Sequence, residues 1–190
     1  MPLMRRLIVS LSLLLLLGAS VSCSSDRAPR PEANLDALFQ QLRSARSQEE
    51  AEMVEVTIRH VWSRSGRGAV DALMGRAVEA IHTGDYDTAI HTLDGVVERA
   101  PDYVEGWNLR ATVHYLRDEY GPAVADIERV LALEPRHFGA LAGLGRIFLE
   151  LDDKKAALAA FEMALSIHPR LAEVREEVTS LREELAGIPI

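Results

Sequence analysis

Six histidines are the residues of this 190-residue chain best suited to metal binding or proton transfer. They lie at His60, His82, His91, His114, His137 and His168. A metal held from one helix face needs a spacing such as that of HExxH, and no pair has it. His82 and His91 could approach each other across a turn, but exposed helical histidines explain them more simply. The sequence therefore predicts no metal site.

Other catalytic patterns are also missing from the sequence. Gly139, Gly143 and Gly145 would need a preceding strand to form a phosphate-binding loop, and they open a helical segment instead. A serine nucleophile elbow is not found, and paired acids fall on expected solvent faces. We therefore predict that the chain is not an enzyme and uses no cofactor.

A secretory signal peptide is predicted for residues 1–22. Arg5 and Arg6 give a basic start, Leu7–Leu17 is almost purely aliphatic, and small residues dominate positions 18–22. This order of segments is typical of an export signal. The apolar run is short for a transmembrane helix, although an uncleaved membrane anchor is the alternative interpretation.

Cys23, the only cysteine, directly follows this exit. The site resembles a bacterial lipoprotein lipobox, in which the cysteine becomes the lipidated N-terminus, but Ser20 stands where that motif normally has leucine. Two fates remain open: lipidation at Cys23, or cleavage nearby and a free mature protein. Residues 23–33 are interpreted as a flexible tether. The expected location is therefore periplasmic, or membrane-anchored by lipid.

The charge of the chain excludes some partners. The net charge is −8, and it becomes −10 after loss of the predicted signal, which contains two arginines and no acid. A surface this acidic repels nucleic acid and anionic lipid headgroups. We expect no nucleic-acid partner, and contact with a membrane only through a lipid anchor.

The body of the chain repeats with a period of 34 residues. Pro101, Pro135 and Pro169 keep this spacing. Further small or apolar columns in the same register are Ala77/Ala111/Gly145, Ala89/Ala123/Ala157, Leu73/Trp107/Leu141 and Leu93/Ile127/Phe161. The small columns predict close approach of two helices in each repeat. The prolines end each second helix, because proline cannot donate the hydrogen bond that a helix interior requires.

These columns resemble the tetratricopeptide repeat family, whose 34-residue unit is a helix pair. The resemblance places repeats at residues 70–103, 104–137 and 138–171. It departs at Ala80 and His114, where aromatic residues are usual, and at Arg76 and Arg110, where leucine is usual. It implies an all-α fold, a right-handed α-α superhelix, over residues 34–190.

Helices that do not match the repeat are expected on both sides. Residues 34–66 read as a degenerate helical pair, with a capping box from Ser47 and Glu50. We expect this pair to cover the open face of the first repeat. Residues 172–187, with an apolar stripe and acidic outer positions, are expected to form the capping helix that an open-ended stack needs.

The family resemblance implies a binding groove on the concave face, lined by the first helix of each pair. The expected groove residues are Met74, Val78 and Ile81 from the first repeat, Asn108, Thr112 and Tyr115 from the second, and Ala142, Arg146 and Leu149 from the third. The Lys/Asn clamp with which some family members grip acidic chaperone tails is missing, because Met74 and Val78 occupy its positions. The alternative is that these are ordinary surface residues.

Arg76 and Arg110 recur at a packing position, 34 residues apart. They either anchor an acidic ligand, or lie along their helices with their guanidinium groups in water or paired with a neighbouring acid.

Together these features predict a non-catalytic interaction module of the bacterial cell envelope, an adaptor or assembly factor that binds a protein or peptide partner in its groove. The alternative is a structural envelope protein that self-associates through Trp62 or the C-terminal helix, so that a homo-oligomer is the competing expectation.

Overall fold

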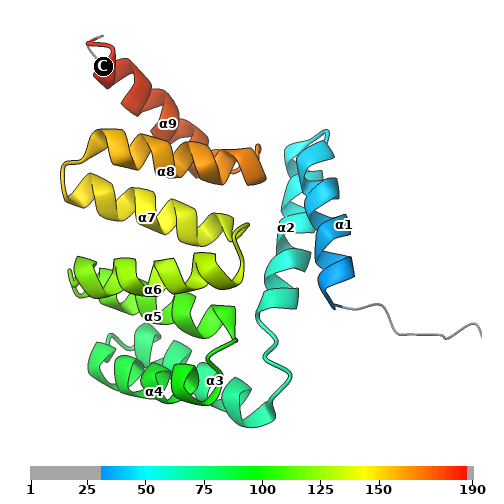
Figure 1. Cartoon of the computed structure of the whole chain (residues 1–190), viewed down its shortest axis with the longest axis vertical. Helices are drawn as coiled ribbons and strands as arrows, with labels where there is room; N and C mark the ends of the chain where they lie inside the picture. The colour runs from blue at the N-terminus through cyan, green and yellow to red at the C-terminus, as the bar shows by residue number, and fades with distance from the viewer. Residues whose placement is uncertain (1–30, 188–190) are drawn as a thin grey trace, which may run out of the picture.

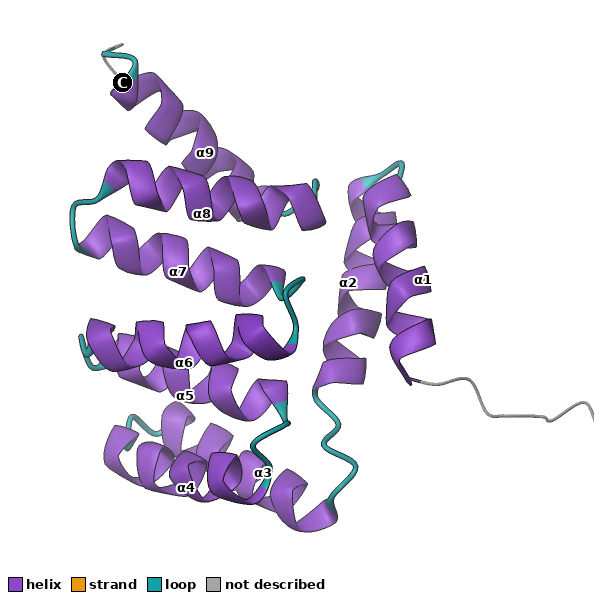
Figure 2. Cartoon of the chain, viewed as in Figure 1, coloured by secondary structure: helices purple, strands orange, loops and turns teal. Residues whose placement is uncertain are grey.

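A computed structural model of the chain describes residues 31–187. This range contains nine α-helices and no strand (Figure 1 and Figure 2). They are α1 (Pro31–Ser44), α2 (Gln48–Trp62), α3 (Gly68–His82), α4 (Tyr86–Arg99), α5 (Val104–Leu116), α6 (Tyr120–Leu133), α7 (Phe138–Glu150), α8 (Lys154–Ile167) and α9 (Ala172–Leu185). The predicted signal peptide, Cys23 and most of the tether lie outside the described residues.

Three helix pairs, α3–α4, α5–α6 and α7–α8, stack on one another as a helical repeat superhelix, and α9 packs on α8 at the end of the stack (Figure 1). From α3 to α9 every helix packs on the next one along the chain, and the contacts are most extensive inside each pair. The 34-residue period therefore corresponds to one pair, and the all-helical repeat prediction is confirmed.

The helix boundaries follow from local chemistry. Helices α4 and α8 begin where Asp85 and Asp153 accept hydrogen bonds from backbone amides of the first turn. The turn inside each pair contains one residue in the left-handed backbone conformation. This residue is Gly84 (φ 75°) in the first repeat, Asp118 (φ 58°) in the second and Asp152 (φ 57°) in the third. Glycine and aspartate are the residue types that tolerate this conformation.

The small columns of the sequence lie where helices meet. Ala77, Ala89, Ala123 and Ala157 are fully buried, and Ala111 is 3% exposed. Phe161 is also fully buried, in a cluster with Leu141 of α7 and Val174, Val178 and Leu181 of α9. The core is thus a series of clusters between neighbouring helices, as expected of a stack without a single centre.

Gly145 is the tightest of these close approaches. A Cβ atom built there would lie 2.4 Å from a ring carbon of Phe161. Gly145→Ala should therefore destabilise the chain by about 1–3 kcal/mol through overpacking, although alanine is the better helix former by about 1 kcal/mol. Urea unfolding of the variant measures the change.

The matched control is Gly75→Ala, a helical glycine of α3 with nothing within 4 Å of a built Cβ. That variant should gain stability. If Gly145→Ala also gains stability, the close approach of α7 and Phe161 is wrong.

The N-terminal pair does not cover the open face of the first repeat, so that prediction was wrong. Helices α1 and α2 run across the ends of the later helices, along one edge of the stack (Figure 1). Their buried face forms a cluster with Phe138 of α7, and Ile167 and Leu171 from the α8–α9 connection pack against it. Half of the expected capping box is present at the start of α2, where Ser47 accepts the Glu50 amide at 3.1 Å, whereas the Glu50 carboxylate accepts the amide of Arg46 instead of that of Ser47.

The loops that follow the three repeats recur every 34 residues, and each of them contacts the N-terminal pair or the residues that flank α2. After Pro101, Tyr103 Oη donates to the Ser63 carbonyl at 2.8 Å. After Pro135, Arg136 pairs with Asp36 of α1. After Pro169, Arg170 donates to the carbonyls of Ala45 and Arg46, both at 2.9 Å. The pair is therefore a brace across all three repeats, which a nearest-neighbour stack would not contain.

Helix α9 closes the opposite end of the stack. Val174, Val178 and Leu181 are at most 4% exposed, as the apolar stripe predicted, whereas Leu185 is 41% exposed in the last turn. None of the helices between residues 31 and 187 has the length and apolar character needed to cross a membrane.

Candidate functional site

A groove with a volume of about 380 Å³ lies between the second and third repeats. Its walls come from α5, α7, the start of α9 and α2. The polar side chains that line it are Asn108, Thr112, Tyr115, Arg146, Glu173 and Arg59. Concave sites of this size with a few convergent polar groups are where proteins commonly bind ligands.

Helix α5 supplies one wall of the groove. Asn108, Thr112 and Tyr115 lie about one turn apart, so they share a face of the helix. The side-chain amide of Asn108 donates to the Glu105 carboxylate at 2.8 Å, and the Thr112 hydroxyl donates to the backbone carbonyl of Asn108 at 3.0 Å. These internal bonds leave mainly acceptor atoms free on this wall.

Helix α7 supplies the opposite wall, which is built from small residues. Gly139, Ala142 and Gly143 let a ligand backbone approach the helix closely, and Arg146 follows one turn later. The Arg146 guanidinium donates to Glu173 of α9 at 3.0 Å. The Arg146 guanidinium is thus already paired with a carboxylate of the same chain.

Arg59 of α2 reaches the groove because the N-terminal pair is docked against the repeats. Its guanidinium lies 2.8 Å from Glu55 and 5.4 Å from the centre of the Phe138 ring. The Glu55 carboxylate also meets His168 at 3.0 Å, and this hydrogen bond, more than the bond to Arg59, lowers the pKa of Glu55. Glu55 therefore carries its charge at neutral pH and holds Arg59 in place.

The structure gathers half of the predicted groove residues and separates the others. Asn108, Thr112, Tyr115 and Arg146 line one groove, with Ala142 in its wall. Met74, Val78, Ile81 and Leu149 do not line it. Met74, Ile81 and Leu149 pack against the helix clusters, and Val78 is 39% exposed on α3. This pocket is therefore lined by the second and third repeats and not by the first, whereas the predicted groove took residues from all three.

Sequence analysis missed Arg59, Leu171 and Glu173. Leu171 and Glu173 belong to the start of α9, and Arg59 belongs to a helix outside the repeats. The residues 34 positions before Leu171 and Glu173 are His137 and Gly139. They flank the start of α7, the first helix of the third pair. The register could therefore have indicated the α9 residues, but no periodic signal indicates Arg59.

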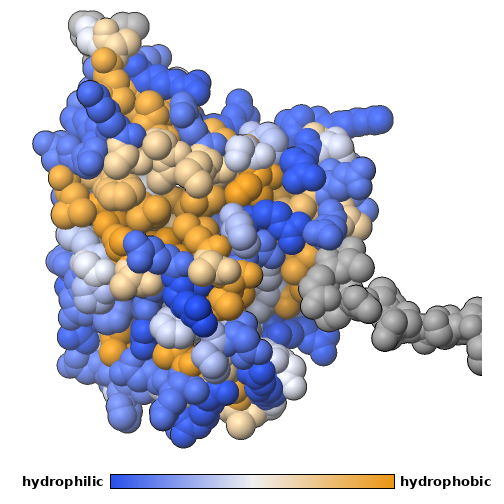
Figure 3. All heavy atoms as spheres, in the orientation of Figure 1, coloured by the Kyte–Doolittle hydropathy of each residue, from blue (hydrophilic) through white to orange (hydrophobic). Residues whose placement is uncertain are grey.

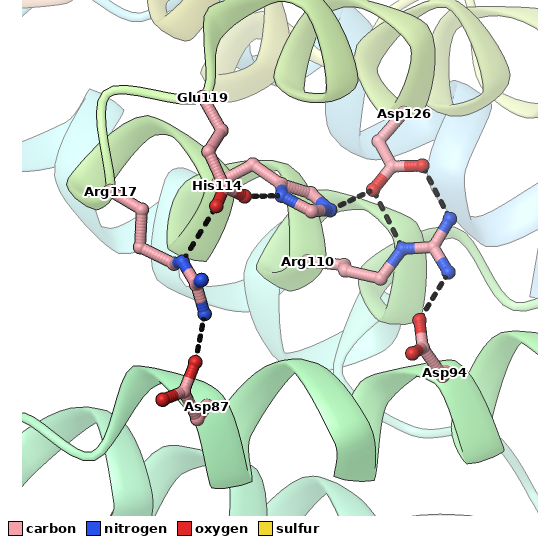
Figure 4. Close-up of polar contacts among 7 residues, drawn as sticks. All are labelled: Asp87, Asp94, Arg110, His114, Arg117, Glu119 and Asp126. Carbon is pink, nitrogen blue, oxygen red and sulfur yellow. Dashed lines mark hydrogen bonds and ion pairs between the residues drawn. The ribbon is translucent and has the colours of Figure 1, made fainter.

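Arg110 belongs to a polar network between repeats, in which neighbouring carboxylates already engage its guanidinium (Figure 4). Its guanidinium contacts Asp126 at 2.7 and 2.8 Å and Asp94 at 2.8 Å. Asp126 is 4% exposed. His114 lies beside it, at 2.6 Å from Glu119 and 4.0 Å from Asp126. The structural interpretation of Arg110 is thus correct, while Arg76, one repeat earlier, is exposed.

Two histidines, His137 and His168, are buried beside the N-terminal pair. His137 stacks on Trp62 with centroids 4.3 Å apart, its Nδ1 accepts the Ala140 amide, and its Nε2 lies 3.2 Å from Glu105. Burial alone would raise the pKa of Glu105, but the bonds from His137 and Asn108 leave it lowered. Within residues 31–187 no three His, Cys, Asp or Glu side chains are arranged to hold a metal ion.

Apolar side chains gather over α7 and α8 on the face seen in Figure 3, whereas the surface over α3 and α4 is mainly polar. The exposed large apolar residues of α8 and of the turn before it include Leu151 and Met163, which are 54% and 56% exposed. This surface lies apart from the groove-lining residues, none of which is Leu151 or Met163.

The fold and the groove define a helical repeat protein with a concave pocket between its second and third repeats. The chain belongs to the tetratricopeptide repeat family, whose model matches residues 74–123 and 119–172. It is similar to a TPR repeat-containing protein of Rhizobium etli, with 38% identity over 83% of this chain and 77% of that protein. It is also 30% identical to the cellulose synthase 2 operon protein C of Komagataeibacter xylinus, but covers only 10% of it.

Solved structures share the fold. The first TPR domain of Spaghetti (RPAP3), bound to an HSP90 peptide, superposes with a TM-score of 0.58 at 20% identity, over 62% of this chain and 93% of that one. The MamA protein superposes with a TM-score of 0.57 at 17% identity, over 83% of this chain and 84% of that one. Tetratricopeptide repeat proteins mediate protein–protein interactions and are generally non-catalytic scaffolds.

Proposed function

We propose that this chain is a non-catalytic adaptor or assembly factor of the bacterial cell envelope, which binds a segment of a partner protein in the groove between α5 and α7. The observation that carries the proposal is the groove itself. It combines a wall of small residues, where a backbone can lie close, with the polar face of Asn108, Thr112 and Tyr115. Backbone groups of an extended segment need such partners when they leave water.

The envelope location is supported by the sequence of the first 23 residues, in which an apolar run follows two arginines and ends before Cys23. Export would place the groove in the periplasm, and lipidation at Cys23 would tether it to a membrane. The acidic net charge of −8 supports a protein partner over nucleic acid.

Filling the groove should abolish partner binding. A Cβ at Gly143 meets only Ile127, at 3.8 Å, so Gly143→Trp starts without a clash and projects its ring into the groove. We expect crosslinking in the native cell to capture a partner with the tagged parent chain, and to lose at least about 90% of it with the variant, since each 1.4 kcal/mol of lost affinity is tenfold.

Met163→Trp provides the matched control, because it adds the same ring on the exposed face of α8, away from the groove. Circular dichroism of both variants checks the fold. A partner that is retained by Gly143→Trp and lost by Met163→Trp would move the binding site to the α7–α8 surface.

The alternative function, a self-associating structural protein, keeps one supporting observation, the apolar surface over α7 and α8 (Figure 3). The surfaces first expected to join copies are not free. Trp62 is 7% exposed within its own chain, and the apolar stripe of α9 is buried against α8. Light scattering of the purified chain separates the two functions, because a monomer removes the structural one.

A further inference from the structure

Two tyrosines and two carboxylates form a corner at one end of the groove. The Tyr115 and Tyr120 rings have centroids 6.1 Å apart and are tilted by 46°. Tyr115 Oη lies 3.4 Å from the Glu150 carboxylate, and Tyr120 Oη donates to Asp118 at 3.0 Å. These four residues are called the tyrosine corner. Tyr115 also lines the groove, so the corner adjoins whatever the groove binds.

The negative charge of the tyrosine corner is not neutralised within residues 31–187. Asp118 and Glu150 are exposed and accept hydrogen bonds only from the two phenols. By contrast, Asp87, Asp94 and Asp126 elsewhere between the repeats each meet an arginine. The cation closest along α7, Arg146, is one turn before Glu150 and is paired with Glu173.

The pKa values of both tyrosines are raised at this corner. Removal from water and the neighbouring Glu150 carboxylate raise the pKa of Tyr115. Removal from water and the hydrogen bond to Asp118 raise the pKa of Tyr120 to about 12. Both phenols therefore stay protonated at neutral pH and direct their hydroxyl groups at carboxylates. The corner presents two aromatic rings beside two negative charges.

We propose that the tyrosine corner binds a lysine or arginine side chain of the partner segment. This inference rests on the proposed function of the groove. A cation is attracted both by the carboxylates and by the faces of aromatic rings. The α5 wall adds acceptors, the side-chain oxygens of Asn108 and Thr112, because the Thr112 hydroxyl and one of the two N–H donors of Asn108 are already engaged within the helix. Arg59 lies beside Phe138 at the start of α7 and is paired with Glu55, whereas Glu150, the last residue of that helix, pairs with no lysine or arginine of residues 31–187, so the unpaired charge lies at the Glu150 end.

The test is a selection of random 12-residue peptides displayed on phage against the immobilised full chain. Four proteins are compared: the parent, the corner variant Asp118→Asn/Glu150→Gln, the groove-filled Gly143→Trp, and the charge control Glu176→Gln/Glu177→Gln on the exposed face of α9. Asparagine is suited to position 118, where φ is 58°. The control removes the same charge from α9, which contains none of the four corner residues, so it reports unspecific attraction of basic peptides.

Peptides that bind the parent and not Gly143→Trp should carry lysine or arginine about two- to fivefold above the library. The corner variant should lose this excess and the charge control should keep it. A groove-dependent set without a basic excess, or an excess that survives in the corner variant, overturns the inference and leaves the proposed function standing. No groove-dependent peptides at all overturns the proposed function, and the inference with it.

Discussion

Phe161→Ala should destabilise the chain by about 3–5 kcal/mol, the usual cost of deleting a buried aromatic ring. Phe161 is fully buried, and its cluster joins α7, α8 and α9. The ring also fills the space that Gly145 leaves open, so its removal would leave a cavity that helices fixed by other contacts can only partly close. Because a stack is stabilised by interfaces between neighbours, the loss should lower the stability of the whole repeat body.

Thermal and urea unfolding of the full chain measure this effect. A change of this size corresponds to a fall in Tm of roughly 2–4 °C per kcal/mol for a chain of this length. Met163→Ala, two residues further along α8 and 56% exposed, is the matched control and should change stability by less than about 0.5 kcal/mol. A Phe161→Ala melt equal to that of the parent would show that the repeat register is wrong.

Arg110→Met should cost about 3 kcal/mol, because it leaves the buried Asp126 carboxylate without its main partner. Methionine keeps most of the aliphatic stem of arginine, so the packing change is small and the loss reports the charge. His114, 4.0 Å from Asp126, can compensate only in part, since it already contacts Glu119 at 2.6 Å. Urea unfolding with the m-value measured in the same experiment gives the free energy of unfolding.

Two further variants define the origin of this loss. The double variant Arg110→Met/Asp126→Leu removes both charges and should recover most of the stability, because replacing a buried ion pair by apolar residues is often close to neutral. Arg76→Met, at the exposed counterpart of Arg110 in the first repeat, should change stability by less than about 0.5 kcal/mol. An Arg110→Met protein as stable as the parent, but deficient in partner binding, would instead restore the ligand-anchor hypothesis.

The brace formed by α1 and α2 changes how the groove should be understood. Its contacts reach the connections after Pro101, Pro135 and Pro169, and it delivers Arg59 to the groove. The Arg170 bonds to the carbonyls of Ala45 and Arg46 span 125 and 124 residues of sequence. The brace therefore contributes to the wall of the groove together with the repeats.

The sequence by itself determined the parts of this protein that depend on neighbouring helices. The 34-residue columns located the helix pairs, the small residues at Ala77, Ala111 and Gly145, and the proline that follows each second helix. A periodic pattern reports these features because each repeat packs mainly on the next, so local spacing and close packing carry the same information. The sequence also placed Asn108, Thr112 and Tyr115 on one helix face, and all three line the groove.

Only the tertiary structure decided where the N-terminal pair docks, which acids Arg110 meets, and that Arg59 enters the groove. These outcomes depend on contacts between segments that no period relates, such as Glu55 with His168, 113 residues apart. They also depend on the path of the connection between α2 and α3, where Gly66 adopts a φ of 71°. The position of α2 thus follows from the apolar and charged surfaces it meets after the repeats have stacked, which a repeat pattern does not encode.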